Sequence, residues 1–98
     1  MAIRIAVARR MNGSNEKRFD HIIALRHHLV GNTKLEADTV QNIVAWLDRS
    51  PENQMFTLDP IDSTKRVEVK VARGFTPPYL HTVANGKIVD NLLQLPLF

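Results

Sequence analysis

The chain lacks cysteine, has one tryptophan and one tyrosine, and contains no long hydrophobic run. Without cysteine it can form neither a disulfide bond nor a thiolate metal site, and such chains fit a reducing cytosol. No segment reaches the roughly 18 apolar residues that a membrane-spanning helix needs. Residues 1–10 contain charged positions and only brief apolar runs, unlike a secretory signal peptide. We therefore expect a cytoplasmic protein with no role in a membrane.

Size and charge indicate the number of domains but not the function of the protein. The 98 residues are 44% apolar, which predicts a single domain, residues 1–98, built around one small core. Thirteen basic and ten acidic residues leave a net charge of +3. A surplus of this size favours solubility or weak attraction to polyanions, and it does not distinguish the two.

The strongest helical pattern lies near the middle of the chain. Its apolar residues are spaced i, i+3, i+4 and i+7, which places them on one helix face: Val40, Ile43, Val44 and Leu47. Asp38 and Gln41 resemble a capping box, although an earlier capping pattern leaves the first turn open. Pro51 supplies the stop, because it restricts the residue before it. We expect a helix from Thr39 to Arg49.

Most of the remaining chain shows strand patterns. Alternating apolar residues and turn signals indicate about six segments: 2–8, 20–30, 54–58, 66–71 and the two arms of a hairpin around Asn85 and Gly86. Segment 20–30 also admits a helical reading, whereas the Asn-Gly pair is a strong signal for a two-residue turn. We expect an α+β fold in which a curled antiparallel sheet of about five or six strands packs against one helix.

The carboxyl end is unusually apolar for a chain terminus. The last twenty residues follow the pattern YLxT…NG…DNLLxLPxF, which begins at Tyr79 and ends at Phe98. This pattern resembles the ending of DUF3892, a bacterial and phage family known only as a domain of unknown function. The resemblance implies a compact single domain and carries no activity with it. The terminal apolar residues either close the core, which we favour, or form an interface for a partner or a second copy: Leu92, Leu93, Leu95, Leu97 and Phe98.

Histidines are frequent for so short a chain, at positions 21, 27, 28 and 81. His27 and His28 are adjacent, so on a strand they point to opposite faces and cannot bind one metal ion. No spacing typical of a metal site occurs. We expect neither a metal nor a cofactor.

A polar cluster could form if the second strand lies beside the final hairpin. Its members would be two carboxylates and two histidines, the groups that general acid–base chemistry uses: Asp20, His21, His81 and Asp90. No serine or cysteine in a recognisable nucleophile context accompanies them. A hydrolase built on this cluster is therefore the least favoured function.

Basic residues gather on the first two predicted strands and the loop between them. If these strands pair, their polar faces would form a basic strip suited to nucleic acid: Arg4, Arg9, Arg10, Lys17, Arg18 and Arg26. Such a strip is more often a solvated face than a nucleic-acid site. We expect a small non-catalytic interaction module whose partner is a protein or a second copy, with weak nucleic-acid binding as the alternative.

Overall fold

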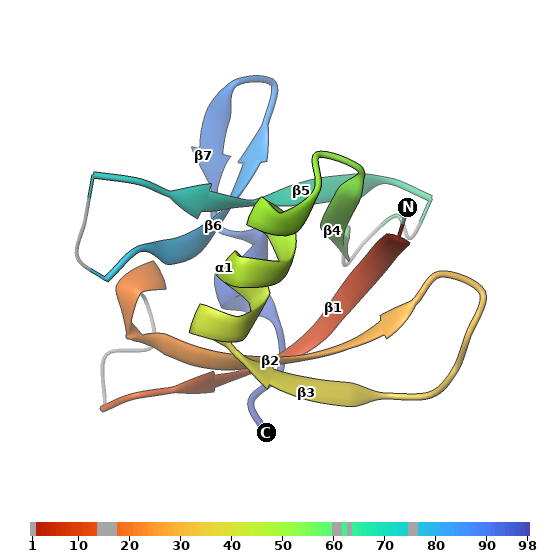
Figure 1. The fold of residues 1–98 in the computed structure, drawn as a ribbon, viewed down its shortest axis with the longest axis horizontal. Coiled ribbons are helices and arrows are strands. Elements are labelled where there is room, and N and C mark those ends of the chain that lie inside the picture. The colour runs from red at the N-terminus through yellow and green to blue at the C-terminus, as the bar shows by residue number, and fades with distance from the viewer. Residues whose placement is uncertain (1, 14–17, 60–61, 63, 75–76) are drawn as a thin grey trace.

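The computed structural model describes residues 2–13, 18–59, 62, 64–74 and 77–98. Within these residues, one helix lies across one face of a seven-stranded sheet whose strand order is β3-β2-β1-β4-β5-β6-β7 (Figure 1). The elements, in chain order, are β1 (Ala2–Met11), the 3-10 helix η1 (Phe19–His21), β2 (Ile22–Leu29), β3 (Glu36–Thr39), α1 (Val40–Arg49), β4 (Asn53–Leu58), β5 (Arg66–Ala72), β6 (Tyr79–Ala84), β7 (Lys87–Val89) and the 3-10 helix η2 (Asn91–Gln94). No helix among the described residues is long and apolar enough to cross a membrane.

The sheet is mixed, which corrects the expectation of a wholly antiparallel one. β1 pairs with β2 in the antiparallel sense and with β4 in the parallel sense, whereas the other described pairs are antiparallel. The reason is the connection through β2, β3 and α1, which returns the chain to the far side of β1 with β4 running in the same direction. Parallel neighbours need such a crossover, and here the predicted helix supplies it.

β3 is the strand that raises the number above the expected five or six. Its four residues read EADT and are mostly exposed. Glutamate, alanine and aspartate are depleted in strands, and the segment shows no alternation of apolar and polar positions. β3 forms because the chain turns back along β2, with His27 opposite Glu36 and Leu25 opposite Asp38.

β1 changes the face that it presents to the core. The pairing of β1 with β2 shifts between Ala6 and Ala8, which marks an irregularity around Val7. Ala6 belongs to the main core cluster, and Ile5 and Arg9 are buried as well. The regular alternation that the sequence indicates over residues 2–8 is therefore interrupted in this strand.

The helix forms almost where the sequence predicts. Thr39 is the N-cap residue, and its hydroxyl accepts a hydrogen bond from the backbone N–H of Asn42 at 3.2 Å. The predicted cap at Asp38 is thus displaced by one residue. Val40, Ile43 and Val44 are buried against the sheet, and the chain leaves helical angles at Ser50, next to the proline.

The carboxyl end also contributes to the core. Asn85 and Gly86 both have positive φ angles, 53° and 76°, as the predicted hairpin turn requires. Leu92 in η2 is fully buried within the core cluster. The last residues then run beside β1, where the backbone N–H of Arg9 donates to the carbonyl of Pro96 at 2.9 Å and that of Phe98 donates to the carbonyl of Arg9 at 3.0 Å.

Candidate binding site

A pocket of about 270 Å³ lies between α1 and the side of the sheet formed by β1, β2 and β3. On the sheet side, Arg4, His27 and Asp38 reach it from three different strands. Strand pairing places them together, because β1, β2 and β3 are consecutive neighbours in the sheet. Three chemically active side chains therefore converge on one cavity.

The opposite wall of the pocket is a second face of α1. Its residues are again spaced i, i+3, i+4 and i+7, beside the buried stripe: Asn42, Ala45, Trp46 and Arg49. Ala45 leaves room at the centre of this wall because its side chain is a single methyl group. Trp46 is partly buried and packs against the core cluster, so the helix holds it in place.

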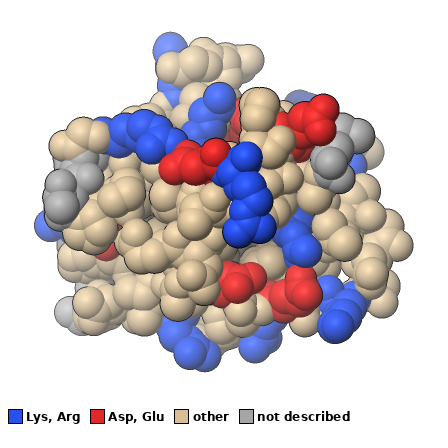
Figure 2. Space-filling model, viewed as in Figure 1, with Lys and Arg blue, Asp and Glu red and all other residues tan. Residues whose placement is uncertain are grey.

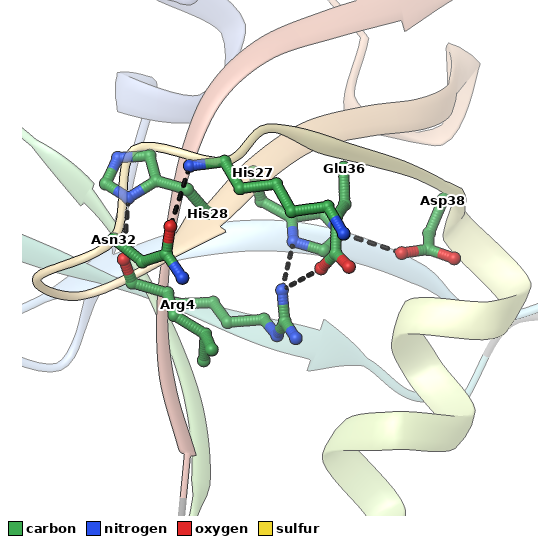
Figure 3. Close-up of polar contacts among 8 residues, drawn as sticks. Arg4, His27, His28, Asn32, Glu36 and Asp38 are labelled. Carbon is green, nitrogen blue, oxygen red and sulfur yellow. Dashed lines mark hydrogen bonds and ion pairs between the residues drawn. The ribbon is translucent and has the colours of Figure 1, made fainter.

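His27 is the buried centre of the site, with only 3% of its surface exposed. Its Nε2 lies 2.8 Å from Oδ2 of Asp38, and its Nδ1 lies 3.2 Å from Nη1 of Arg4 (Figure 3). Arginine can only donate, so Nδ1 accepts, and the neutral ring carries its proton on Nε2 and donates it to the carboxylate. The two neighbours thereby select one tautomer of His27.

Arg4 links the histidine to the third strand. Its Nη1 also donates to Oε2 of Glu36 at 2.5 Å, and its guanidinium carbon lies 5.8 Å from the centre of the Trp46 ring. The hydrogen bond from Arg4, and then its positive charge, lower the pKa of Glu36 below its ordinary value. Arg4, His27, Glu36 and Asp38 thus form a continuous polar network across three strands.

This network orients groups but does not prepare a proton acceptor. A general base needs a free lone pair within reach of the proton that it removes. Here Nδ1 of His27 accepts from Arg4, and Nε2 donates to Asp38. The arrangement suits binding and positioning around the cavity.

A second hollow, of about 510 Å³, lies near the start of α1. It is lined mainly by apolar and proline residues, including Ile22, Val40 and Pro78. Its carboxylate, Asp20, is engaged by Arg18. Fewer polar groups with defined partners converge there than in the pocket beside His27.

The predicted basic strip is divided between the faces of the sheet. Arg4 lines the pocket, and Arg9 is buried at 6% exposure with its Nε donating to the carbonyl of Leu95. Arg10 and Arg26 instead lie over the ring of Phe98, at 4.6 and 4.5 Å from its centre. Among the members of the strip that the structure describes, Arg10 and Arg26 are the pair that stays together as a basic surface.

The rest of that strip contributes little to a continuous surface. Arg18 forms a two-pronged contact with Asp20, at 3.0 and 2.7 Å, and Lys17 lies outside the described residues. On the face that carries α1, acidic and basic side chains are interspersed (Figure 2).

The members of the predicted acid–base cluster have separate partners. Arg18 holds the pKa of Asp20 below its ordinary value, chiefly through their hydrogen bond, while Asp90 accepts a hydrogen bond from Gln94. His81 makes edge-on contacts with the rings of Phe19 and Tyr79.

The two histidines of that cluster do not provide a base held by a carboxylate. Burial, followed by the charge of Lys70, lowers the pKa of His81. Nδ1 of His21 is buried without a hydrogen-bond partner among the described residues. Within the same residues, no group of three or more histidines and carboxylates is arranged to hold a metal ion.

The terminal apolar residues divide into a buried group and an exposed one. Leu92 is completely buried, and Leu93 and Leu95 pack against the core cluster. Leu97 is 50% exposed, and Phe98 lies under the two arginines. This end of the chain therefore serves mainly to complete the core, and Leu97 is the member that remains open to solvent.

One wall of the pocket could have been predicted from the sequence, because its residues have a helical spacing next to that of the buried helix residues. Asn42, Ala45, Trp46 and Arg49 repeat the helical spacing of the buried stripe, one face further round. The contact between His27 and Asp38 had no such signal, because it depends on the unpredicted strand β3.

Comparison with known proteins identifies a family and nothing more specific. A family model described as "Protein of unknown function (DUF3892)" matches residues 4–96. No curated protein and no solved structure matches the chain.

Proposed function

Since the chain belongs to the DUF3892 family of proteins of unknown function, we propose its function from its own geometry: it is a non-catalytic binding module. The binding site is the free edge of β3 together with the pocket beside His27. The partner is a protein that supplies an extended segment. That segment adds a strand to the sheet and places one side chain in the pocket.

The edge strand supports this proposal. β3 ends the sheet, and Glu36, Ala37 and Thr39 are exposed. The outer backbone groups of an edge strand can pair with an extended peptide, which is a recurrent mode of protein recognition. The other edge, β7, has three residues against the four of β3, and the pocket lies beside β3.

The position of the pocket is the observation that carries the proposal. Asp38 belongs to β3 and also lines the pocket, so a strand paired with β3 would pass beside the cavity. A volume of about 270 Å³ is close to the lower end of the range for small-ligand sites and suits a single large side chain. Backbone pairing would supply affinity, and the pocket would select the side chain.

The state of His27 supports binding over catalysis. Both ring nitrogens are occupied by Arg4 and Asp38, so a substrate would have to displace a charged neighbour before the ring could take a proton. The predicted hydrolase residues offer no alternative, because Asp20 is held by Arg18 and Asp90 by Gln94.

The test is a selection of peptides from a random library against the purified domain. The selected peptides should slow amide hydrogen exchange in β3 when they bind. Ala45→Leu, which fills the pocket with a residue that favours helix, should weaken their binding at least about tenfold. Gln41→Leu is the matched control, because Gln41 is also exposed on α1 but lines the other hollow.

Three results would overturn this proposal. Peptides that bind equally well to wild type and to Ala45→Leu do not use the pocket. Peptides whose binding is lost in Gln41→Leu and kept in Ala45→Leu use the other hollow instead. Saturable hydrolysis that disappears in His81→Ala would replace the proposal with the hydrolase.

Nucleic-acid binding is the second candidate, and the Arg10–Phe98–Arg26 stack favours it. Neither arginine pairs with an aspartate or glutamate among the described residues, although Nε of Arg10 donates to the main-chain oxygen of Phe98 at 3.3 Å. Stacked guanidinium groups can bind phosphate or bases. Binding of single-stranded DNA should then weaken steeply as salt rises, and Arg10→Glu with Arg26→Glu should abolish it. Absence of binding at low salt would exclude this function.

The setting of the module is also a proposal. We propose a cytoplasmic protein of bacterial or phage origin, as the lack of cysteine and the resemblance suggested. Self-association through the exposed Leu97 is a further option, which sedimentation of the purified domain would detect.

A further inference from the structure

The pocket beside His27 has two chemically different ends. Asp38 and His27 lie toward the start of α1, since Asp38 directly precedes the cap residue Thr39. Arg49 is the last residue of the helix. From Asn42 to Arg49 the helix rises about 10 Å, so Arg49 lies at the far end of this helical wall from Asn42.

Hydrogen-bond donors outnumber acceptors at the basic end. Arg4 uses Nη1 for both of its contacts, with His27 and Glu36, so its other guanidinium nitrogens make no hydrogen bond within the described residues. Arg49 has no carboxylate partner there. The indole N–H of Trp46 also lacks an acceptor among these residues. These donors of Arg4, Arg49 and Trp46 therefore have free hydrogen-bonding capacity in the described part of the chain, and a ligand with an acceptor group could satisfy it.

The charge of the site limits what that ligand can carry. Two basic residues, Arg4 and Arg49, stand against two acidic ones, Glu36 and Asp38, so the sum is zero. A carboxylate adds one negative charge next to arginine, where a two-pronged hydrogen bond is favourable. A phosphate dianion would add two negative charges to a site whose charges already sum to zero.

We infer that the Arg49 end of the pocket binds the carboxylate of an acidic side chain, aspartate or glutamate, carried by the partner's extended segment. This inference rests on the proposed function for the extended segment. The pocket geometry supplies the rest: Arg49 and Arg4 act as donors, and Trp46 forms the wall between them. Ala45 leaves the space that the side chain fills.

Trp46 makes the inference directly measurable, because it is the single tryptophan of the chain. Its fluorescence therefore reports on this pocket alone. The titration uses N-acetylglutamate N-methylamide as the acidic probe and N-acetylglutamine N-methylamide as its neutral match. Inorganic phosphate is the third probe.

The acidic probe should give a saturable change that the neutral probe gives only at concentrations about tenfold higher, since one charge-assisted hydrogen bond is at stake. Arg49→Gln should remove this difference, because glutamine keeps the helix propensity and loses the charge. Arg66→Gln should leave it unchanged, since Arg66 lies over Phe56, away from the pocket.

Several results would overturn the inference: equal binding of the two glutamyl probes, an unaltered preference in Arg49→Gln, tighter binding of phosphate, or no response to any probe. The binding of the selected peptides to the variants shows whether the carboxylate site or the proposed function has failed. If they bind, lose affinity in Ala45→Leu and do not respond to Arg49→Gln, the module stands and the carboxylate site falls. If no peptide uses the pocket but the acidic probe shows its preference, the carboxylate site stands alone.

Discussion

His27 in β2 and Asp38 in β3 are joined by a hydrogen bond of 2.8 Å, although they do not face each other directly. The strand register pairs His27 with Glu36 and Asp38 with Leu25, so the contact is diagonal. Diagonal neighbours on adjacent strands lie within reach of long side chains. This bond ties a short, exposed edge strand to the buried interior of the sheet.

Removal of the His27 side chain should therefore destabilise the domain. His27→Ala leaves a cavity and strips Asp38 and Arg4 of a partner, so we expect a loss of about 2–4 kcal/mol in the free energy of unfolding, measured with urea. His28→Ala is the matched control, because this neighbour points to the other face and is partly exposed. It should change the free energy by less than about 0.5 kcal/mol. Equal effects would contradict the network.

The two adjacent histidines should also carry their protons on different nitrogens. In His27, Nδ1 accepts from Arg4, so the proton sits on Nε2. In His28, Nδ1 lies 2.8 Å from the carbonyl oxygen of Leu29, which can only accept, so Nδ1 carries the proton. Long-range proton–nitrogen correlation spectra at about pH 8.5, well above the usual range for histidine, should show this opposition. The same tautomer in both rings would refute it.

The fold could be predicted where the signals were local. The turn at Asn85 and Gly86, the helix up to Arg49 and the strand at 66–71 each follow from short-range patterns, and the structure confirms them. Family membership was likewise readable from the carboxyl end. These features depend on neighbouring residues, whose effects the sequence displays directly.

Features that depend on distant contacts could not be predicted. The parallel pairing of β1 with β4 follows from the path of the chain through β3 and α1, and no residue in either strand signals it. The polar segment EADT becomes a strand only because β2 lies beside it. His27 was visible as a histidine, but its contacts with Arg4 and Asp38 depend on the register of β1 with β2 and of β2 with the unpredicted strand β3.

Glu36 should make stability depend on pH in a defined window. Arg4 lowers the pKa of Glu36 in the folded state, so this carboxyl stays ionised in the folded chain when the unfolded chain takes up a proton. Its contribution is full above the ordinary value of 4.5 and is lost as pH falls through the lowered value. Wild type should exceed Glu36→Gln in urea midpoint at neutral pH, and the difference should disappear in that window.

An Arg4→Met background is the control for this titration. Without the guanidinium, the effect of Glu36→Gln should vary much less with pH in the same range, because the two largest causes of the lowered pKa, the hydrogen bond from Arg4 and its charge, are gone. A difference that keeps its pH dependence in this background would show that another group is responsible.

Two leucines of the carboxyl-terminal segment should contribute very differently to the free energy of unfolding. Leu92 is fully buried, and its backbone N–H donates to Oγ1 of Thr82 at 3.2 Å. Leu92→Ala keeps that backbone bond but leaves a cavity, so we expect a loss of about 3–5 kcal/mol in the free energy of unfolding. Leu97→Ala makes the same chemical change at 50% exposure and should cost less than about 1 kcal/mol. If the two variants unfold at the same urea concentration, η2 does not close the core in solution, and the C-terminal leucines are available to a partner after all.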